Sequence, residues 1–182
     1  MNLEKDMEFN LSKESDRLKV VKAVLGWETP ENVWPAYDLD VSCFLLDDNS
    51  KLMDESGLIY YNALKSVDGS VVKSPDELTG GTEEVYINIE KLSPSVKEIS
   101  IVVTIHKAKE RMQNFKQVTG SYIKFFNNET NEQIAVFQLD RIEELSTGVQ
   151  VGSFFNRPEG LIFQPVGKGE FATLGDYLAA YK

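Results

Sequence analysis

The segment YDLDVSCFLLDD, Tyr37–Asp48, decides the fold class. Its apolar residues recur at every second position, which is the spacing of a strand that turns one face toward a core. The face expected to point into the core carries Leu39, Val41, Cys43 and Leu45. Asp38 and Asp40 begin the opposite face, so the segment predicts a core strand that starts with two carboxylates side by side.

The same alternation recurs along the chain, for example in residues 85–89 and 99–105. Residues 20–26 give a further strand ending at Gly26, and two hairpins are expected around NNETNE (127–132) and NRPEG (156–160). Many strand-length runs joined by short turns predict a mainly β protein, folded as an antiparallel β-sandwich.

Helix is scarce in this sequence. Residues 106–118 predict one or two turns, with an inner stripe of Met112, Phe115 and Val118. The C-terminal segment TLGDYLAAYK predicts a short amphipathic helix whose inner face carries Leu174, Tyr177, Leu178 and Tyr181. There is no linker or internal repeat, so residues 1–182 are expected to form a single domain with residues 1–10 as a loose N-terminal extension.

Composition narrows the class of partner and the compartment. The chain has a formal net charge of −10, which disfavours nucleic acid and bare anionic membrane as partners. No apolar run is long enough to cross a bilayer, so direct membrane insertion is not expected. One cysteine excludes an internal disulfide, and the N-terminus lacks the apolar core of a secretory signal, which together predict a cytoplasmic protein.

Candidate ligands for a hard cation gather in the middle of the sequence. The loop region 60–84 is rich in oxygen-bearing side chains and contains three glycines, a composition that suits Ca²⁺. An acidic protein also has acidic loops for no special reason, and the EF-hand order is absent. Asp38 and Asp40 repel each other unless a divalent cation or a lysine neutralises them, and Lys65 and Lys73 are the nearest lysines in sequence.

The sequence gives little support for catalysis. His106 is the only histidine, and no nucleophile or orienting acid lies at a readable spacing from it. Cys43 falls on the apolar face of its strand, where a thiol is expected to be inert. Trp27 is expected in the core, whereas Trp34, before a proline, is a candidate for an exposed contact residue. We therefore expect a protein that is not an enzyme.

Five segments in order resemble the TerD family of tellurium-resistance and stress-response proteins. They are VLGWE, YDLDVSCFLLDDNSKL, YYNALKSVDGSVVKS, IVVTIHKAKERMQNFKQV and VGKGEFATLGDYLAAY, and the resemblance covers the chain from about Phe9 to Tyr181. It implies a cytoplasmic β-sandwich whose acidic loops bind two Ca²⁺ ions and which acts without catalysis, as a sensor or scaffold. A protein partner is implied as well: a membrane protein of the same resistance system or another TerD-like protein.

The resemblance also implies a set of metal ligands. Carried over position by position, they are Asp38, Asp40, Asn62, Asp68, Asp76, Glu83 and Glu84.

The departures from the family pattern fall mainly in the acidic loops. The family's Gly-Asp-Asn is here Pro75-Asp76-Glu77, its long acidic glycine-rich stretch is shortened to TGGTEE, and Ala63 replaces an amide. We therefore expect one well-formed Ca²⁺ site on Asp38, Asp40 and Asp68 and a second that is weak or absent. The alternative is a small-ligand module, nucleotide-like in its ligand, with a degenerate metal site.

Overall fold

The structure is a computed structural model that describes residues 1–15, 17–75, 81–139 and 145–182. One sheet is built from β1 (Phe9–Asn10), β3 (Leu39–Leu46), β4 (Leu58–Ile59), β7 (Glu98–Ile105), β10 (Gly148–Arg157) and β11 (Gly160–Glu170). The other is built from β2 (Val20–Glu28), β5 (Val71–Lys73), β6 (Thr82–Asn88), β8 (Thr119–Asn127) and β9 (Gln133–Gln138). The helices are α1 (Leu11–Glu14), α2 (Ala108–Arg111) and α3 (Leu174–Tyr181), with 3-10 turns η1 (Glu55–Gly57), η2 (Ile89–Lys91) and η3 (Phe115–Gln117).

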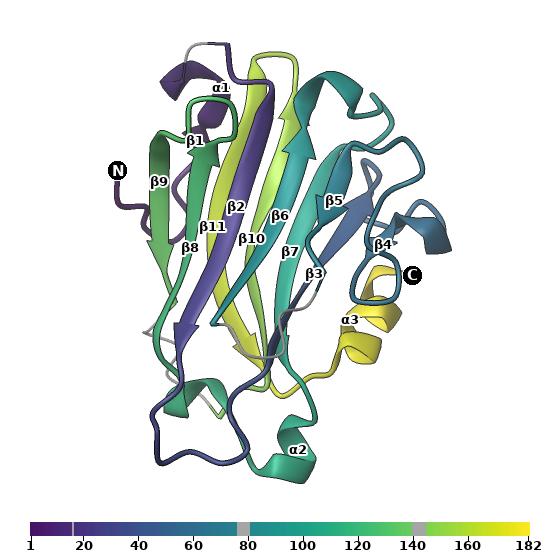
Figure 1. The fold of residues 1–182 in the computed structure, drawn as a ribbon. Coiled ribbons are helices and arrows are strands. Elements are labelled where there is room, and N and C mark those ends of the chain that lie inside the picture. Colours follow the sequence, from purple (N-terminus) through teal and green to yellow (C-terminus); the bar gives the residue numbers. More distant parts are fainter. Residues whose placement is uncertain (16, 76–80, 140–144) are drawn as a thin grey trace.

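The two sheets pack face to face, and their strands pair antiparallel (Figure 1). The order in the six-stranded sheet is β1-β11-β10-β7-β3-β4, and in the five-stranded sheet it is β5-β6-β2-β8-β9. One apolar cluster fills the space between them. The predicted antiparallel β-sandwich is therefore confirmed, as are both predicted hairpins, β8–β9 and β10–β11.

Strand β3 is buried on both faces. It pairs with β7 from Leu39 opposite Ile105 to Leu46 opposite Glu98, and its predicted inner residues join the central cluster. Its outer face is covered as well, because α3 packs against Phe44 and Leu46 with the four residues predicted for its inner face: Leu174, Tyr177, Leu178 and Tyr181. The C-terminal helix thus forms a third layer over part of the six-stranded sheet (Figure 1).

The predicted helical stripe in residues 106–118 is only partly correct. Phe115 and Val118 are buried, but Met112 is 83% exposed. The helix ends at Arg111, and Met112 takes the left-handed backbone conformation with φ of 51°, which turns the chain away from the helical path. A stripe that assumes one continuous helix therefore misplaces the first of its three residues.

The N-terminal residues are not a loose extension. Leu3 and Phe9 are buried, and β1 pairs with β11 of the six-stranded sheet. The Leu3 amide donates to the carbonyl of Val136 in β9, at 2.8 Å, and the Asp6 amide donates to that of Pro165 in β11, at 2.9 Å. Residues 1–10 therefore connect the edges of the two sheets, which the polar composition of the segment did not indicate.

Among the described residues, no helix has the length and apolar character needed to cross a membrane.

Candidate functional site

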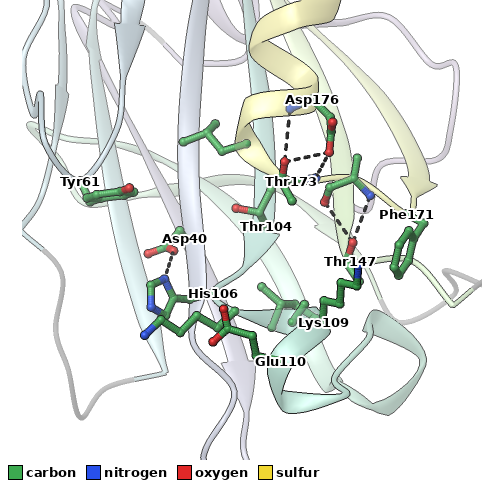
Figure 2. Close-up of a pocket in the computed structure, with 15 residues that line it drawn as sticks. Asp40, Tyr61, Thr104, His106, Lys109, Glu110, Thr147, Phe171, Thr173 and Asp176 are labelled. Carbon is green, nitrogen blue, oxygen red and sulfur yellow. Dashed lines mark hydrogen bonds and ion pairs between the residues drawn. The ribbon is translucent and has the colours of Figure 1, made fainter.

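A cavity of about 390 Å³ opens on the outer face of the six-stranded sheet, where β7 runs into α2 and the chain enters α3 (Figure 2). Residues from five segments of the chain line it, including Asp40, Tyr61, Thr104, His106, Lys109, Thr147 and Phe171. We call this cavity the Asp40 hollow. Its lining mixes carboxylates, cations, hydroxyls and two aromatic rings, which is the composition of a recognition surface for a polar ligand.

Asp40 and His106 form the polar centre of the hollow. Asp40 lies opposite Thr104 in the β3–β7 ladder, and its Oδ2 is 3.7 Å from Nδ1 of His106 (Figure 2). The His106 amide also donates to the carbonyl of Asp38, at 2.8 Å. The imidazole therefore lies beside a carboxylate that is only 8% exposed.

The far wall of the hollow is fixed by local hydrogen bonds before α3. The Thr147 hydroxyl donates to the carbonyl of Ala172 and accepts from its amide, both at 3.0 Å. Thr173 and Asp176 form a capping box, and the backbone hydrogen bond from Thr173 holds the pKa of Asp176 below its usual value (Figure 2). The α3 N-terminus is therefore already satisfied by the protein itself.

Glu83 belongs to a different environment, at the edge of β3. It lies in β6 at an inward position, 4% exposed, and its Oε1 is 3.0 Å from the ammonium of Lys73 in β5. Its Oε2 accepts a hydrogen bond from the Val41 amide of β3, at 2.6 Å. The carboxylate thus links the two sheets and already has a cationic neighbour.

Glu84 points to the other face of β6, as strand alternation requires. Its Oε2 accepts a hydrogen bond from the Tyr86 hydroxyl, which raises the pKa of Tyr86 to about 12. Glu83 and Glu84, both predicted as metal ligands, therefore point to opposite faces of the sheet.

Asp68 lies at the opposite end of the sandwich. It is in the turn before β5 and lines a second, smaller cavity together with Leu45. Leu45 is five residues after Asp40 in β3, a separation of about 17 Å at the usual rise per residue of a strand. Its Oδ1 accepts hydrogen bonds from Ser66 and from the amide and hydroxyl of Ser70, at 2.7–2.9 Å. Although partial burial opposes the shift, these hydrogen bonds lower the pKa of Asp68. The predicted grouping of Asp38, Asp40 and Asp68 is therefore not supported by their positions.

The remaining predicted ligands are dispersed. Asp38 is half-buried just before β3, and Asn62 is exposed in the turn from Tyr60 to Ala63, next to Tyr61 of the hollow. Asp76 lies outside the described residues. Within residues 1–15, 17–75, 81–139 and 145–182, no three His, Cys, Asp or Glu side chains gather as a metal site. Since Ca²⁺ takes six to eight oxygens, these residues do not complete one by themselves.

Sequence reasoning missed two arrangements: the Lys73–Glu83 pair and two walls of the hollow. The Lys73–Glu83 pair had a detectable signal: Lys73 follows Val71 and Glu83 precedes Val85 at inward positions of two successive strands. The walls formed by Tyr61 and Phe171 had none, because these residues are far apart in sequence and line the same cavity only in the folded protein.

Cys43 is 1% exposed, and burial raises the pKa of its thiol to about 12. At neutral pH the thiol is therefore protonated and shielded, as the sequence predicted.

Exposed apolar residues gather near the hollow. Trp34 is 93% exposed, Met112 83% and Phe171 74%. The Gln113 side chain donates to the Pro35 carbonyl at 2.7 Å, which ties the Trp34 loop to the α2 segment. Trp27, by contrast, is buried as predicted, and its indole donates to the Tyr37 carbonyl. We call this end of the sandwich, with Trp34, Met112 and Phe171, the loop end. Its large apolar side chains are exposed to solvent.

Comparison with known proteins gives a consistent result over the whole chain. A family model described as the TerD domain matches residues 1–181. The tellurium resistance protein TerD of Serratia marcescens is 33% identical over 100% of this chain and 96% of its own length. General stress protein 16U of Bacillus subtilis is 34% identical over 93% of this chain and 90% of its own.

A solved structure shares the fold. The crystal structure of a homologue of the telluride resistance protein TerD, from Streptomyces coelicolor, superposes with a TM-score of 0.69 at 19% identity. It covers 88% of this chain, and this chain covers 95% of it.

Proposed function

Because the chain belongs to the TerD family, we propose that it is a stress-response protein that acts by binding rather than by catalysis, in resistance to tellurite or to another chemical stress. The names of its relatives, which refer to tellurium resistance and to general stress, support the stress part of this proposal. The argument against redox catalysis comes from the chain itself.

The observation that carries the proposal is the state of Cys43. Reduction of an oxyanion by a protein thiol requires an accessible thiolate, since the thiolate is the nucleophile. Cys43 is the only cysteine, is 1% exposed and has a pKa raised to about 12. A thiol in that position packs in the core. We therefore propose that the protein acts through the polar hollow and the loop end.

The test is resistance in cells that depend on this protein. We expect Cys43→Ala to retain the resistance of the wild-type protein, because its thiol takes no part in the activity. We expect Trp34→Ala, which alters the loop end without disturbing the core, to reduce resistance severalfold at equal protein levels. Val67→Ser serves as the control, since Val67 is 86% exposed and lies beside the distant cavity. Loss of resistance with Cys43→Ala alone would contradict the proposal.

The loop end also supports a protein partner. Large exposed apolar side chains such as Trp34 and Met112 are typical of the centres of protein interfaces. We propose that the partner is a protein, either a membrane protein of the same resistance system or another TerD-like chain, and that it is met in the cytoplasm. The Trp34→Ala result bears on this proposal directly, since unchanged resistance would argue against a partner at the loop end.

Calcium is the second part of the proposal, and we restrict it to the Asp38–Asp40 segment. Asp40 lines the hollow and Asp38 lies two residues before it, whereas Asp68 is at the other end and Glu83 is held by Lys73. Further oxygens are required for any such site, because the described residues do not complete one. A small polar ligand is the alternative occupant of the hollow, favoured by its volume of about 390 Å³.

A thermal melt of chelator-treated protein titrated with Ca²⁺ tests this restriction. At a hundredfold excess over Kd a single site adds about 2.7 kcal/mol, a rise of roughly 5–10 °C in Tm for a chain of this size. We expect Asp38→Asn/Asp40→Asn to abolish the rise and Asp68→Asn to retain it. No rise in the wild-type protein would favour the small-ligand alternative, and loss of the rise in Asp68→Asn would restore the original three-residue grouping.

A further inference from the structure

The two sheets differ in what covers their outward surfaces. Helix α3 packs on the six-stranded sheet, whereas no helix among the described residues covers the five-stranded one, whose strands β2, β6 and β8 lie open at the front of Figure 1. Half-buried apolar and aromatic side chains point outward from it: Val20, Val24, Val72, Tyr86, Tyr122 and Phe126. We call this surface the β2 face. An open apolar surface of this breadth is typical of a docking site.

The aromatic side chains of the β2 face lie along the sheet. A Cβ atom at Gly26 would be 2.4 Å from Cζ of Tyr122, so the tyrosine ring lies across β2 where this strand has no side chain. The Lys124 ammonium is 4.2 Å from the centroid of the Tyr122 ring, and the Lys22 ammonium is 5.1 Å from that of Phe126. The surface is therefore flat enough for another sheet to pack against it.

Two opposite charges lie at equal distances from the centre of this face. In one cross-strand row, Val24 of β2 pairs with Glu84 of β6 on one side and with Lys124 of β8 on the other. Across two strand spacings the two charged residues are about 10 Å apart, too far for an ion pair within one chain. Among the described residues, neither forms an ion pair with another side chain.

We propose that the β2 face binds the same face of a second copy of this chain, around a two-fold axis that runs along β2 above Val24. Such an axis lays β2 over β2 and exchanges β6 with β8, so that Lys124 of each copy meets Glu84 of the other. The same rotation brings Tyr86 over Phe126, and aromatic residues are enriched at the centres of interfaces. An axis across the strands would instead place like charges on each other, which is unfavourable.

Lys22 is the residue that this arrangement must accommodate. It lies on β2 between Tyr86 and Phe126, so the axis brings it close to Lys22 of the second copy. Its ammonium is directed to the side, because it donates to Oδ1 of Asn131 in the turn between β8 and β9, at 3.0 Å. The like charges are thereby kept away from the axis, and the stem of the side chain adds apolar surface.

The size of the β2 face sets the expected affinity. Its five strands span about 24 Å, and the seven residues of β6 extend over about 24 Å, which gives a flat area of about 600 Å². A standard interface buries roughly 800 Å² on each partner. We therefore expect a reversible dimer with a Kd in the micromolar range.

This inference goes beyond the proposed function and does not depend on it. The proposed function places a partner at the loop end, whereas the dimer uses a sheet face and a second copy of the same chain. The two can fail separately, because the resistance test with Trp34→Ala does not measure self-association. Conversely, a monomeric wild-type protein would leave the resistance proposal unchanged.

Sedimentation velocity of the full chain, from micromolar to near-millimolar concentration, tests the dimer. The wild-type protein should pass from monomer to dimer over this range. Glu84→Lys places lysine opposite Lys124, and Lys124→Glu places glutamate opposite Glu84, so each variant alone should raise Kd by about tenfold or more. An equimolar mixture of the two variants should associate as the wild-type protein does, because every facing pair is then opposite in charge.

Two further variants serve as controls, with circular dichroism to verify folding. Glu84→Lys/Lys124→Glu restores complementarity within one chain and should dimerise alone. Glu159→Lys changes the net charge as much as Glu84→Lys does, at an exposed position in the β10–β11 turn, and should dimerise like the wild-type protein. If Glu84→Lys does not fold, Val24→Lys replaces it, since it places a charge on the axis itself and should likewise prevent association.

Three results would overturn the proposal. The first is a wild-type protein that stays monomeric over the whole range. The second is a dimer that persists unchanged in Lys124→Glu and in Glu84→Lys or its replacement, since that dimer would use another surface. The third is a mixture of the two folded charge-reversal variants that does not associate, because facing charges would then have no part in the contact.

Discussion

Replacing Phe154 with alanine is expected to lower the free energy of unfolding by about 3–5 kcal/mol. Phe154 is fully buried in β10, and its ring lies 4.8 Å from that of Phe163 in β11 and 5.5 Å from that of Phe125 in β8, between ring centroids. Phe125 and Phe163 are 4.5 Å apart. The three rings join the two sheets at one point, so truncation of one leaves a cavity that its neighbours cannot readily fill.

The matched control is Phe171→Ala, which removes the same atoms from a residue that is 74% exposed. Its expected change is within about 0.5 kcal/mol, because no core contact is lost. Urea unfolding followed by far-ultraviolet circular dichroism measures both variants, and unchanged m values would show that the midpoints can be compared. Comparable losses in the two variants would mean that the aromatic cluster does not hold the sheets together.

The sandwich could be predicted because most of its strands carry the same local signal. In β3 and β8 the inward residues alternate with others, and the turns between hairpin strands contain Asn, Pro or Gly. The C-terminal helix was predictable for the same reason, since its inner residues recur at helical spacing. These features depend on near neighbours in the chain, which a single sequence displays.

The candidate site was less predictable, because its composition depends on how many times the chain runs from one end of the sandwich to the other. The chain ascends in β3, descends in β4 and ascends again before the turn that holds Asp68, so this residue reaches the end opposite to Asp40. Spacing in sequence does not indicate the direction of each crossing. The burial of Lys73 against Glu83 depends likewise on contact between a strand edge and the facing sheet.

The N-terminal segment shows how composition alone can mislead. Most of residues 1–10 are polar or charged, and this suggested a loose extension. Two apolar residues are nevertheless sufficient to anchor the segment, because Leu3 and Phe9 insert into the central cluster while the backbone between them bonds to both sheets. An average over ten residues conceals this, since anchoring depends on particular positions.

Deletion of residues 1–10 is therefore expected to destabilise the protein strongly. Burial of Leu3 and Phe9 together contributes about 3–6 kcal/mol, an upper estimate because the unfolded chain already buries part of this surface. The deletion also removes the cover from the edges of β9 and β11, and uncovered edges template association between chains. We expect a lower midpoint in urea, together with concentration-dependent light scattering.

Two double variants determine whether stability depends on the two buried side chains or only on the presence of the segment. Leu3→Ser/Phe9→Ser keeps the length of the chain but removes both apolar anchors, and it should reproduce most of the loss. Glu4→Ser/Lys5→Ser changes only exposed side chains of the same segment and should leave the midpoint nearly unchanged. A deletion without effect on stability or scattering would show that the sandwich closes its own edges. In that case the contacts of residues 1–10 with Val136 and Pro165 would follow from the fold and contribute nothing to it.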